Sequence, residues 1–235
     1  MTSYRVEQHG HIAVLTMNSN ENRFNPESIQ AFTAALDQIE HETRATALIV
    51  TSSHDKIWCN GLDINWLLHD IQTTGEAAIN AFMSKVYTLL RRILTFPMPT
   101  IACITGHAFG AGAFLAFAHD MRFMRADRGW ICFPEADMGL TLGPVFMALA
   151  KRIVPLPLFE EMQYTARRID AATALDHRII KQAYPLEELK KEACAYAKNL
   201  TRPRDIIHKM KLENLGSTIS AIDEALAELD KTNRN

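Results

Sequence analysis

Residues 97–118 read PMPTIACITGHAFGAGAFLAFA, and this stretch decides the fold. It lies within a longer segment, 93–118, that contains no Asp, Glu, Lys or Arg and is long enough to span a bilayer. Two prolines interrupt the first part of that segment and three glycines interrupt the rest, which disfavours a continuous membrane helix. The pattern instead predicts a buried strand over 100–104, a glycine-rich turn, and a buried helix over 110–118.

Outward from this stretch, apolar strands alternate with amphipathic helices over the first two thirds of the chain. The other expected strands lie at 4–8, 11–17, 47–51, 57–59, 121–124 and 130–133. The other expected helices run from Pro26 to about His41, after an N-cap at Asn25, and from about Gly75 to just before Phe96. Beyond Pro144 the chain is predicted to be helical, with one short strand near 178–183. This alternation predicts an α/β fold with buried strands.

The last predicted helix carries an apolar stripe. The stripe consists of Ile219, Ile222, Ala225, Leu226 and Leu229. A terminal helix with such a stripe packs either on the core of its own chain or on a partner subunit, and the sequence leaves both arrangements open.

The composition is that of an ordinary globular protein. The chain has 235 residues, of which 48% are hydrophobic and 22% charged, and its formal net charge is −2. These values exclude a disordered or fibrous chain, and they do not favour nucleic acid or an anionic membrane as the main partner. One domain with a small appendage is the expected organisation.

The cysteines and histidines indicate neither disulfides nor a metal. The four cysteines, Cys59, Cys103, Cys132 and Cys194, form no Cys-x-x-Cys motif and are expected to be reduced and packed as small hydrophobic residues. The nine histidines are scattered, so no metal site is expected. The first residues show no signal-peptide core and the last residues no peroxisomal or ER tag, so we expect a cytoplasmic protein.

Three short segments could carry chemistry. Segments 58–63 and 106–112 each join a strand to a helix through a glycine turn, which leaves backbone N–H groups free at the start of a helix. If the two turns face each other, they form an oxyanion hole. In segment 133–140, Glu135 follows a buried strand among apolar neighbours, where loss of hydration raises the pKa of a carboxyl towards that of a general base. Taken alone, each segment is more often an ordinary turn or a surface glutamate.

Together and in this order, the segments resemble the crotonase superfamily, also called the enoyl-CoA hydratase/isomerase family. The resemblance covers nearly the whole chain and is carried by HIAVLTMN, KIWCNGLDI, PMPTIACITGHAFGAGAFLA, HDMRFMRADRGWICFPEADMGL and ARRIDAATALDHRIIKQAYP. It implies an α/β fold in which a crotonase-like spiral of ββα units over 1–185 is followed by a C-terminal helical trimerisation segment over 186–235. It also implies an acyl-CoA thioester substrate, no cofactor apart from the coenzyme A of that substrate, and a homotrimer or hexamer.

By the same resemblance, the backbone N–H groups of Leu62 and Ala111 hold the thioester oxygen. Hydratases of the family carry two glutamates, whereas this chain has Phe114 at the first of those places and Glu135 at the second. One carboxylate is enough to move a proton between two carbon atoms, so the pattern resembles the Δ3,Δ2-enoyl-CoA isomerases of fatty acid β-oxidation. We therefore expect Glu135 to remove a proton from C2 of a 3-enoyl-CoA and return it at C4.

Two further sets of residues are assigned to the substrate. The acyl pocket is expected to consist of Trp66, Phe109, Phe114, Phe133 and Met138. The coenzyme A part is expected to contact Arg23, Phe24, Lys56 and Asn60.

Two alternatives to the isomerase remain open at this point. One is another reaction on the same scaffold, namely hydration, thioester hydrolysis or decarboxylation, of which hydrolysis would release free CoA thiol. The other is a non-catalytic acyl-CoA-binding or scaffold protein, which would form no conjugated thioester from a 3-enoyl-CoA.

Overall fold

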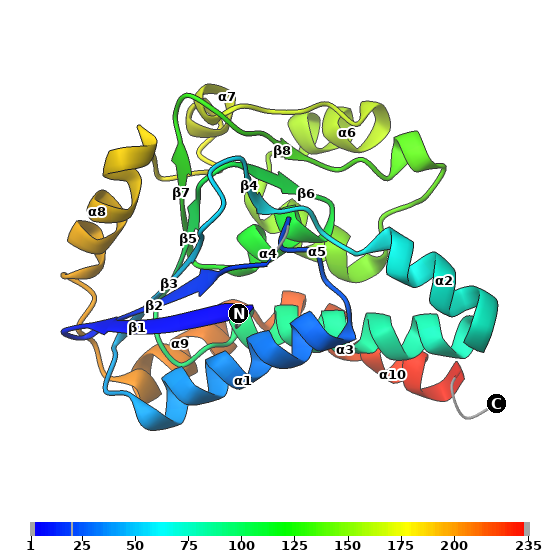
Figure 1. Cartoon of the computed structure of the whole chain (residues 1–235), viewed down its shortest axis with the longest axis horizontal. Coiled ribbons are helices and arrows are strands. Elements are labelled where there is room, and N and C mark those ends of the chain that lie inside the picture. The colour runs from blue at the N-terminus through cyan, green and yellow to red at the C-terminus, as the bar shows by residue number, and fades with distance from the viewer. Residues whose placement is uncertain (1–2, 20, 233–235) are drawn as a thin grey trace.

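The largest sheet of the molecule follows the predicted alternation of strands and helices. The computed structural model describes residues 3–19 and 21–232 (Figure 1). Six strands form this sheet in the order β1-β2-β3-β5-β7-β9; β1 runs antiparallel to β2, and every other neighbouring pair is parallel. The strands are β1 (Tyr4–His9), β2 (Ile12–Met17), β3 (Ala47–Ser52), β5 (Thr100–Ile104), β7 (Met121–Arg125) and β9 (Gln182–Tyr184).

The helices surround this sheet and fill the last third of the chain, as predicted. Asn25 caps the first of them: its side chain accepts from the Ser28 N–H, and Ser28 Oγ accepts from the Asn25 N–H, both at 2.9 Å. The helices are α1 (Pro26–Glu42), α2 (Ile64–Thr74), α3 (Glu76–Leu94), α4 (Ala111–Ala118), the 3₁₀ turn η1 (Ala136–Met138), α5 (Pro144–Ile153), α6 (Leu156–Thr165), α7 (Ala171–Asp176), α8 (Leu186–Ala197), α9 (Arg204–Asn214) and α10 (Gly216–Thr232).

Both faces are buried at the centre of the sheet, which explains why β2, β3 and β5 consist mostly of apolar residues. In β2, Val14 belongs to the same buried cluster as Leu189 of α8, whereas Leu15 belongs to a second buried cluster with Phe32 of α1 and Leu90 of α3. Successive side chains of a strand point to opposite faces, so a strand covered on both sides has no polar position to keep.

A second, smaller sheet brings the two glycine turns together. It consists of β4 (Ile57–Cys59), β6 (His107–Phe109) and β8 (Ile131–Cys132), all parallel. The glycine pattern predicts 107–109 as part of a turn, and this prediction is wrong because pairing with β4 and β8 holds these residues in a strand. The strand predicted over 130–133 is confirmed only for its central pair, β8.

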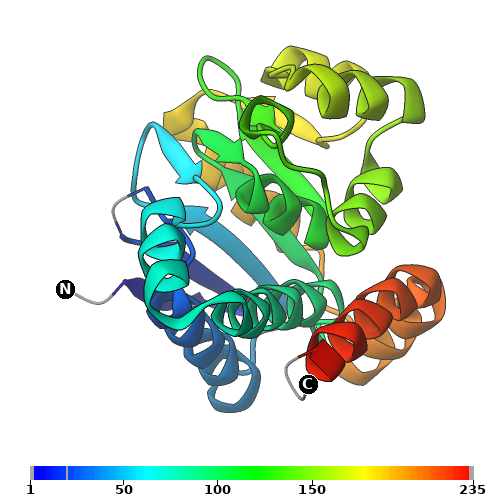
Figure 2. The same ribbon diagram turned by 90° about the vertical axis from the view of Figure 1, so that its right-hand side faces the viewer.

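The C-terminal helices pack on the chain that carries them. Figure 2 shows α10 beside α3, and α10 also contacts α5. Ile222 of the predicted stripe is fully buried, Ile219 and Ala225 are nearly so, and Leu226 and Leu229 are partly buried against the same core. Of the two arrangements left open by the sequence, the described chain therefore adopts the one in which the helix folds back on its own core. The division predicted at residue 185 falls between β9 and α8.

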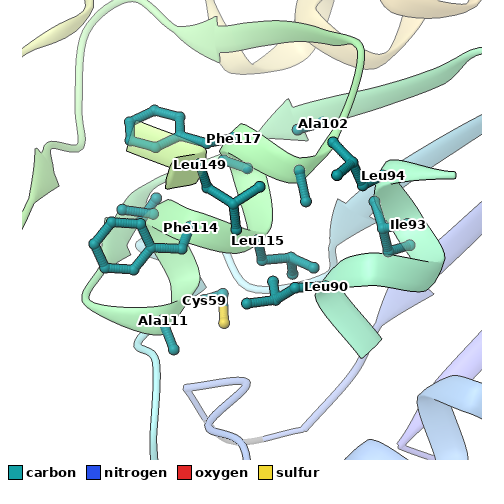
Figure 3. Packing of buried hydrophobic residues seen from close by; sticks show 14 of the residues in the cluster. Cys59, Leu90, Ile93, Leu94, Ala102, Ala111, Phe114, Leu115, Phe117 and Leu149 are labelled. Atoms are coloured by element: carbon teal, nitrogen blue, oxygen red, sulfur yellow. The ribbon is translucent and has the colours of Figure 1, made fainter. Parts of the chain in front are cut away.

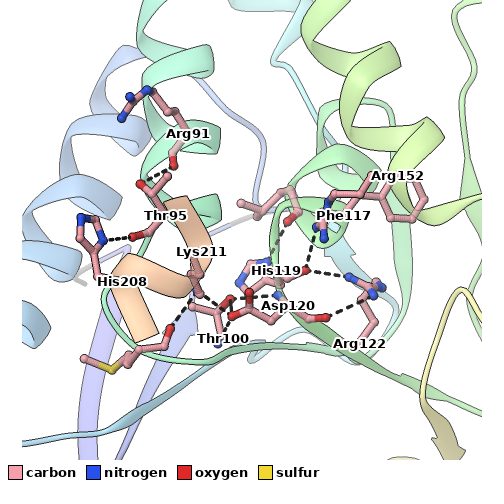
Figure 4. A network of polar contacts seen from close by, with 12 residues as sticks. Arg91, Thr95, Thr100, Phe117, His119, Asp120, Arg122, Arg152, His208 and Lys211 are labelled. Atoms are coloured by element: carbon pink, nitrogen blue, oxygen red, sulfur yellow. Dashed lines mark hydrogen bonds and ion pairs between the residues drawn. The ribbon is translucent and has the colours of Figure 1, made fainter. Parts of the chain in front are cut away.

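A buried ion pair ties α9 to the large sheet (Figure 4). Lys211 Nζ lies 2.7 Å from Asp120 Oδ2 and donates to the Met98 carbonyl at 3.0 Å. The same carboxylate oxygen accepts from the N–H of Thr100 at 2.7 Å. Lys211 is only 7% exposed, so these partners, and not water, stabilise its positive charge.

The uncharged segment 93–118 is divided among several elements. It contains the end of α3, then β5, β6 and α4, which agrees with the sequence analysis. Within residues 3–19 and 21–232, no helix has the length and apolar character needed to cross a membrane.

Candidate active site

A cavity of about 490 Å³ lies between the ends of β4 and β6 and the helices α2, α3 and α5. Most of its lining is apolar. Of its polar residues, Asn60 and Glu135 belong to the three segments described above, whereas Arg23, Tyr87 and Thr141 lie outside them. A wider groove of about 690 Å³ runs along α9, but Asp120 in that groove is already paired with Lys211. The cavity beside the two glycine turns is therefore the candidate active site.

In the turn after β4, the N–H of Leu62 points away from the adjacent segment of the chain at Phe24. Phe24 forms an isolated parallel bridge with Leu62: the Phe24 N–H donates to the Gly61 carbonyl at 2.7 Å, and the Phe24 carbonyl accepts from the Asp63 N–H at 2.8 Å. These bonds use the residues on either side of Leu62, so the Leu62 N–H points to the opposite side. Leu62 lines the cavity, and its N–H has no hydrogen-bond partner within the described residues.

The second turn presents the start of α4. The N-cap of this helix is Gly110, whose φ is 51°, and its carbonyl accepts from the N–H groups of Ala113 and Phe114 at 2.9 and 3.3 Å. Ala111 and Gly112 precede these donors, so their N–H groups have no partner inside the helix. Ala111 lines the cavity and is otherwise buried.

The two turns touch each other through Gly61. A Cβ at this position would lie 2.6 Å from the Phe109 carbonyl oxygen and 2.9 Å from the Ala111 nitrogen. The φ of Gly61 is 76°, which also favours glycine. The absence of a side chain at residue 61 is therefore what allows the Leu62 and Ala111 donors to lie near each other.

Glu135 lies directly beside the second turn. A Cβ on Gly110 would lie 3.4 Å from Glu135 Oε1, and Oε2 is buried without a hydrogen-bond partner in the described part of the chain. Burial raises the pKa of the Glu135 carboxyl above its ordinary value of 4.5. The N–H groups of Met138 and Leu140 donate to its carbonyl at 3.0 and 2.9 Å and hold the backbone in a turn.

An aromatic stack occupies the space behind the cavity. The Phe114 ring is fully buried and stacks on Phe146, with centroids 4.5 Å apart, and on Phe133, with centroids 5.0 Å apart. Figure 3 shows Phe114 on α4 among the buried side chains that fill this region. Among the lining residues whose side chains the structure describes, Glu135 is the only carboxylate.

The cavity brings together most of the residues expected to contact the substrate. Its lining includes Glu135, Leu62 and Ala111, the acyl-pocket residues Phe109 and Met138, and the expected coenzyme A contacts Arg23 and Asn60. The Arg23 Nε donates to Glu21 Oε2 at 2.7 Å, so part of its charge is already balanced.

Three of the expected acyl-pocket residues do not line the cavity. Trp66 lies on another face of α2 from Ile64 and packs on Phe82, with ring centroids 5.0 Å apart. Phe114 and Phe133 belong to the aromatic stack behind the cavity wall. None of these three side chains therefore lines the acyl pocket, contrary to the prediction.

Two expected coenzyme A contacts also lie outside the cavity. Phe24 is fully buried and contributes only its backbone bridge to the site, because its side chain belongs to the core. Lys56 is exposed and does not line the cavity. Its contact with the coenzyme A part of a substrate outside the cavity stays a prediction.

One wall of the cavity is formed by residues of α3 and α5 that no sequence pattern pointed to. Met83 and Tyr87 lie one turn apart on α3, and Gly143 and Phe146 lie at the start of α5. The apolar spacing of α3 predicted a buried face, but no local pattern indicates which part of that face borders a cavity.

Two features characterise this cavity: backbone N–H groups without partners at two glycine turns, and one desolvated carboxylate beside them. A model of the enoyl-CoA hydratase/isomerase family matches residues 7–234, so the chain belongs to that family.

Two relatives and one solved structure place the chain within the family. It is 31% identical to the peroxisomal enoyl-CoA delta isomerase 2 of Arabidopsis thaliana, over 78% of each chain. It is 34% identical to enoyl-CoA delta isomerase 3 of the same plant, over 61% of this chain and 60% of that one. The crystal structure of an enoyl-CoA hydratase/isomerase family protein from Pseudomonas syringae superposes with a TM-score of 0.87 at 28% identity, and the match covers 96% of both chains.

Proposed function

We propose that the protein isomerises 3-enoyl-CoA thioesters to the conjugated 2-enoyl-CoA. The observation that carries this proposal is the single carboxylate of the cavity, Glu135, beside two turns with free backbone donors. This isomerisation requires one group that removes a proton from one carbon and returns it to another, and it requires no second group to activate water. Relatives named enoyl-CoA delta isomerases support the same assignment.

The chemistry assigns a role to each part of the site. The thioester oxygen accepts hydrogen bonds from the Leu62 and Ala111 N–H groups, which stabilises the negative charge that develops when the C2 proton leaves. Glu135 takes this proton and returns it at C4, so the carboxylate is regenerated and the double bond moves into conjugation. The raised pKa of Glu135 makes it a better proton acceptor than an ordinary glutamate.

The hydratase alternative is less well supported by the site. In hydratases of the family a second glutamate manages the added water, whereas here Phe114 stacks between two other aromatic rings. This stack keeps both water and charge out of the place where the second carboxylate would act.

The proposal is tested with purified protein and a 3-enoyl-CoA. We expect absorbance of the conjugated thioester to grow without release of free CoA thiol, and Glu135→Gln to abolish most of this signal. Glu224→Gln, an exposed position on α10, is the matched control and should behave like wild type. Release of thiol in place of conjugation would indicate a hydrolase, and the absence of both products with intact binding would indicate a scaffold.

We also propose that the protein assembles as a homotrimer, alone or paired into a hexamer. The apolar stripe of α10 is used within the chain, but Ile206 and Met210, one turn apart on α9, are 41% and 57% exposed and provide apolar contact surface. Light scattering at micromolar concentration should give at least three times the 26.5 kDa chain mass. A clean 26.5 kDa species would contradict the proposal.

A further inference from the structure

One polar group of the cavity has no part in the chemistry described above. The Tyr87 side chain lines the cavity from α3 but is only 7% exposed, and its hydroxyl makes no hydrogen bond within the described part of the chain. The hydroxyl oxygen is not among the fully buried polar atoms that lack a partner, so it reaches the surface of the cavity instead of being enclosed by the core. The hydroxyl is therefore available for a hydrogen bond with whatever fills the cavity.

The surroundings of the Tyr87 hydroxyl favour an acceptor oxygen. Burial raises the pKa of Tyr87 above its ordinary value of 10.0, so the phenol keeps its proton and can donate it. A Cβ on Gly143 would lie 3.0 Å from the hydroxyl oxygen, so the hydroxyl lies at the start of α5, where Gly143 is the N-cap.

The start of α5 adds a positive electrostatic bias at the same place. Gly143 provides no side-chain cap, Pro144 has no N–H, and the first N–H that turns back to the Gly143 carbonyl is that of Met147, at 3.0 Å. The N–H groups of Val145 and Phe146 therefore lack partners inside the helix. The partial positive charge of this helix end and the phenol donor act in the same direction.

Apart from Thr141, the described residues of this wall are apolar, and none of them is a cation. Met83, Leu67 and Phe146 surround the cavity on this side, and Arg23, the only basic residue in its described lining, is paired with Glu21. A carboxylate bound here would lose its hydration without gaining a counter-ion. A neutral hydroxyl or carbonyl oxygen would not suffer this loss.

We propose that Tyr87 is a specificity-determining residue, and that the acyl groups preferred by this site carry a neutral oxygen, as hydroxyl or carbonyl, on the chain beyond the reacting carbons. The inference rests on the proposed acyl-CoA isomerase and adds the chemical class of the acyl chain. Tyr87 donates to that oxygen at the start of α5, while Glu135 and the two backbone donors act on the thioester end.

Binding of saturated acyl-CoA thioesters tests the inference without depending on the isomerase reaction. For each chain length, dissociation constants are measured for three forms: unsubstituted, with a hydroxyl at successive positions from C6 to C10, and with a terminal carboxylate. In wild type we expect the best hydroxylated form to bind about three- to tenfold more tightly than the unsubstituted one, which is the effect of one net hydrogen bond. The carboxylate form should bind more weakly than both.

Tyr87→Phe keeps the ring and removes only the hydroxyl, so it should bind both neutral forms equally. Tyr164→Phe is the matched control, because Tyr164 is 69% exposed on α6 and should leave the preference unchanged. A wild-type protein without the preference, or a Tyr87→Phe variant that keeps it, would overturn the inference.

The same variants separate this inference from the proposed function. Turnover of unsubstituted 3-enoyl-CoA by wild type reports on the isomerase alone. If turnover fails but the hydroxyl preference disappears in Tyr87→Phe, the function is wrong and the specificity inference stands. If turnover succeeds and the preference does not depend on Tyr87, only the inference is wrong.

Discussion

Replacing Glu135 with glutamine keeps the length and polarity of the side chain but removes the lone pair that accepts the substrate proton. Oε1 already lies beside Gly110 and Oε2 has no partner in the described chain, so the amide enters a site of unchanged shape. Loss of a general base costs about 100- to 10,000-fold in rate. At 1.36 kcal/mol for each factor of ten, the barrier rises by about 2.7–5.4 kcal/mol.

Binding and folding should not fall with the activity of this variant. The proposed oxyanion donors are backbone groups of Leu62 and Ala111, so the dissociation constant of an acyl-CoA should change little. Burial raises the pKa of Glu135, which means that the folded protein holds this proton more tightly than the unfolded chain. The ionised carboxyl therefore destabilises the fold above its folded pKa, and glutamine should unfold at the same or a higher temperature at neutral pH. Below the ordinary value of 4.5 this advantage should disappear.

The pH dependence of wild type provides an independent check. Because the carboxylate form is the base, kcat/KM should rise with pH through one ionisation whose midpoint lies above 4.5. Glu135→Asp withdraws the carboxylate by one methylene and should be more active than Glu135→Gln but less active than wild type. A folded Glu135→Gln protein that binds substrate and isomerises it within a few-fold of wild type would refute the mechanism.

Other features of the site and fold lead to further predictions. Wild type should hydrate a 2-enoyl-CoA more slowly than it isomerises a 3-enoyl-CoA, because Phe114 provides no second carboxylate; equal rates, with the 3-hydroxyacyl product measured by chromatography, would contradict this. Gly61→Ala should lower kcat by about 100- to 1000-fold, because its Cβ would lie 2.9 Å from the Ala111 nitrogen; unchanged turnover of the folded variant would show that the turns do not act together. Lys211→Met should lower the free energy of unfolding by about 3–5 kcal/mol, because Asp120 loses its buried cation, and Asp120→Asn in the same chain should restore part of it. Urea denaturation measures both, and a loss below about 1 kcal/mol would place the pair among surface salt bridges.

The regular elements were predictable because their signals are local. Strands such as β3 begin with four consecutive apolar residues and are buried over their whole length, and α1 is marked by Asn25 and Pro26 at its start. The strand β6 was missed because it has only three residues between two glycines, and its partners β4 and β8 are distant in the sequence. Pairing energy between distant segments cannot be read from such a short pattern.

The residues of the site were likewise predictable where the signal is local and not predictable where it depends on distant parts of the chain. Glu135 and the glycine turns could be found because each occupies a short segment in which backbone donors or a desolvated carboxyl follow directly from neighbouring residues. Trp66 was misassigned because each step along a helix rotates the side chain by about 100°, so the two steps from Ile64 to Trp66 turn it by about 200°. Ile64 consequently faces the cavity, whereas Trp66 packs on Phe82.

The glycines of the two turns connect the packing of the fold to its chemistry. A Cβ on Gly112 would lie 2.2 Å from the Cys59 carbonyl oxygen, and one on Gly106 would lie 2.1 Å from the Lys56 carbonyl oxygen. Together with Gly61, they allow the second turn to press directly against β4 and the turn that follows it. Backbone groups packed this closely reorganise little when charge develops on a bound oxygen, which is the condition under which hydrogen-bond donors accelerate a reaction most. In the proposed mechanism, these glycines therefore contribute to catalysis by allowing the two turns to pack closely, and not by contacting the substrate.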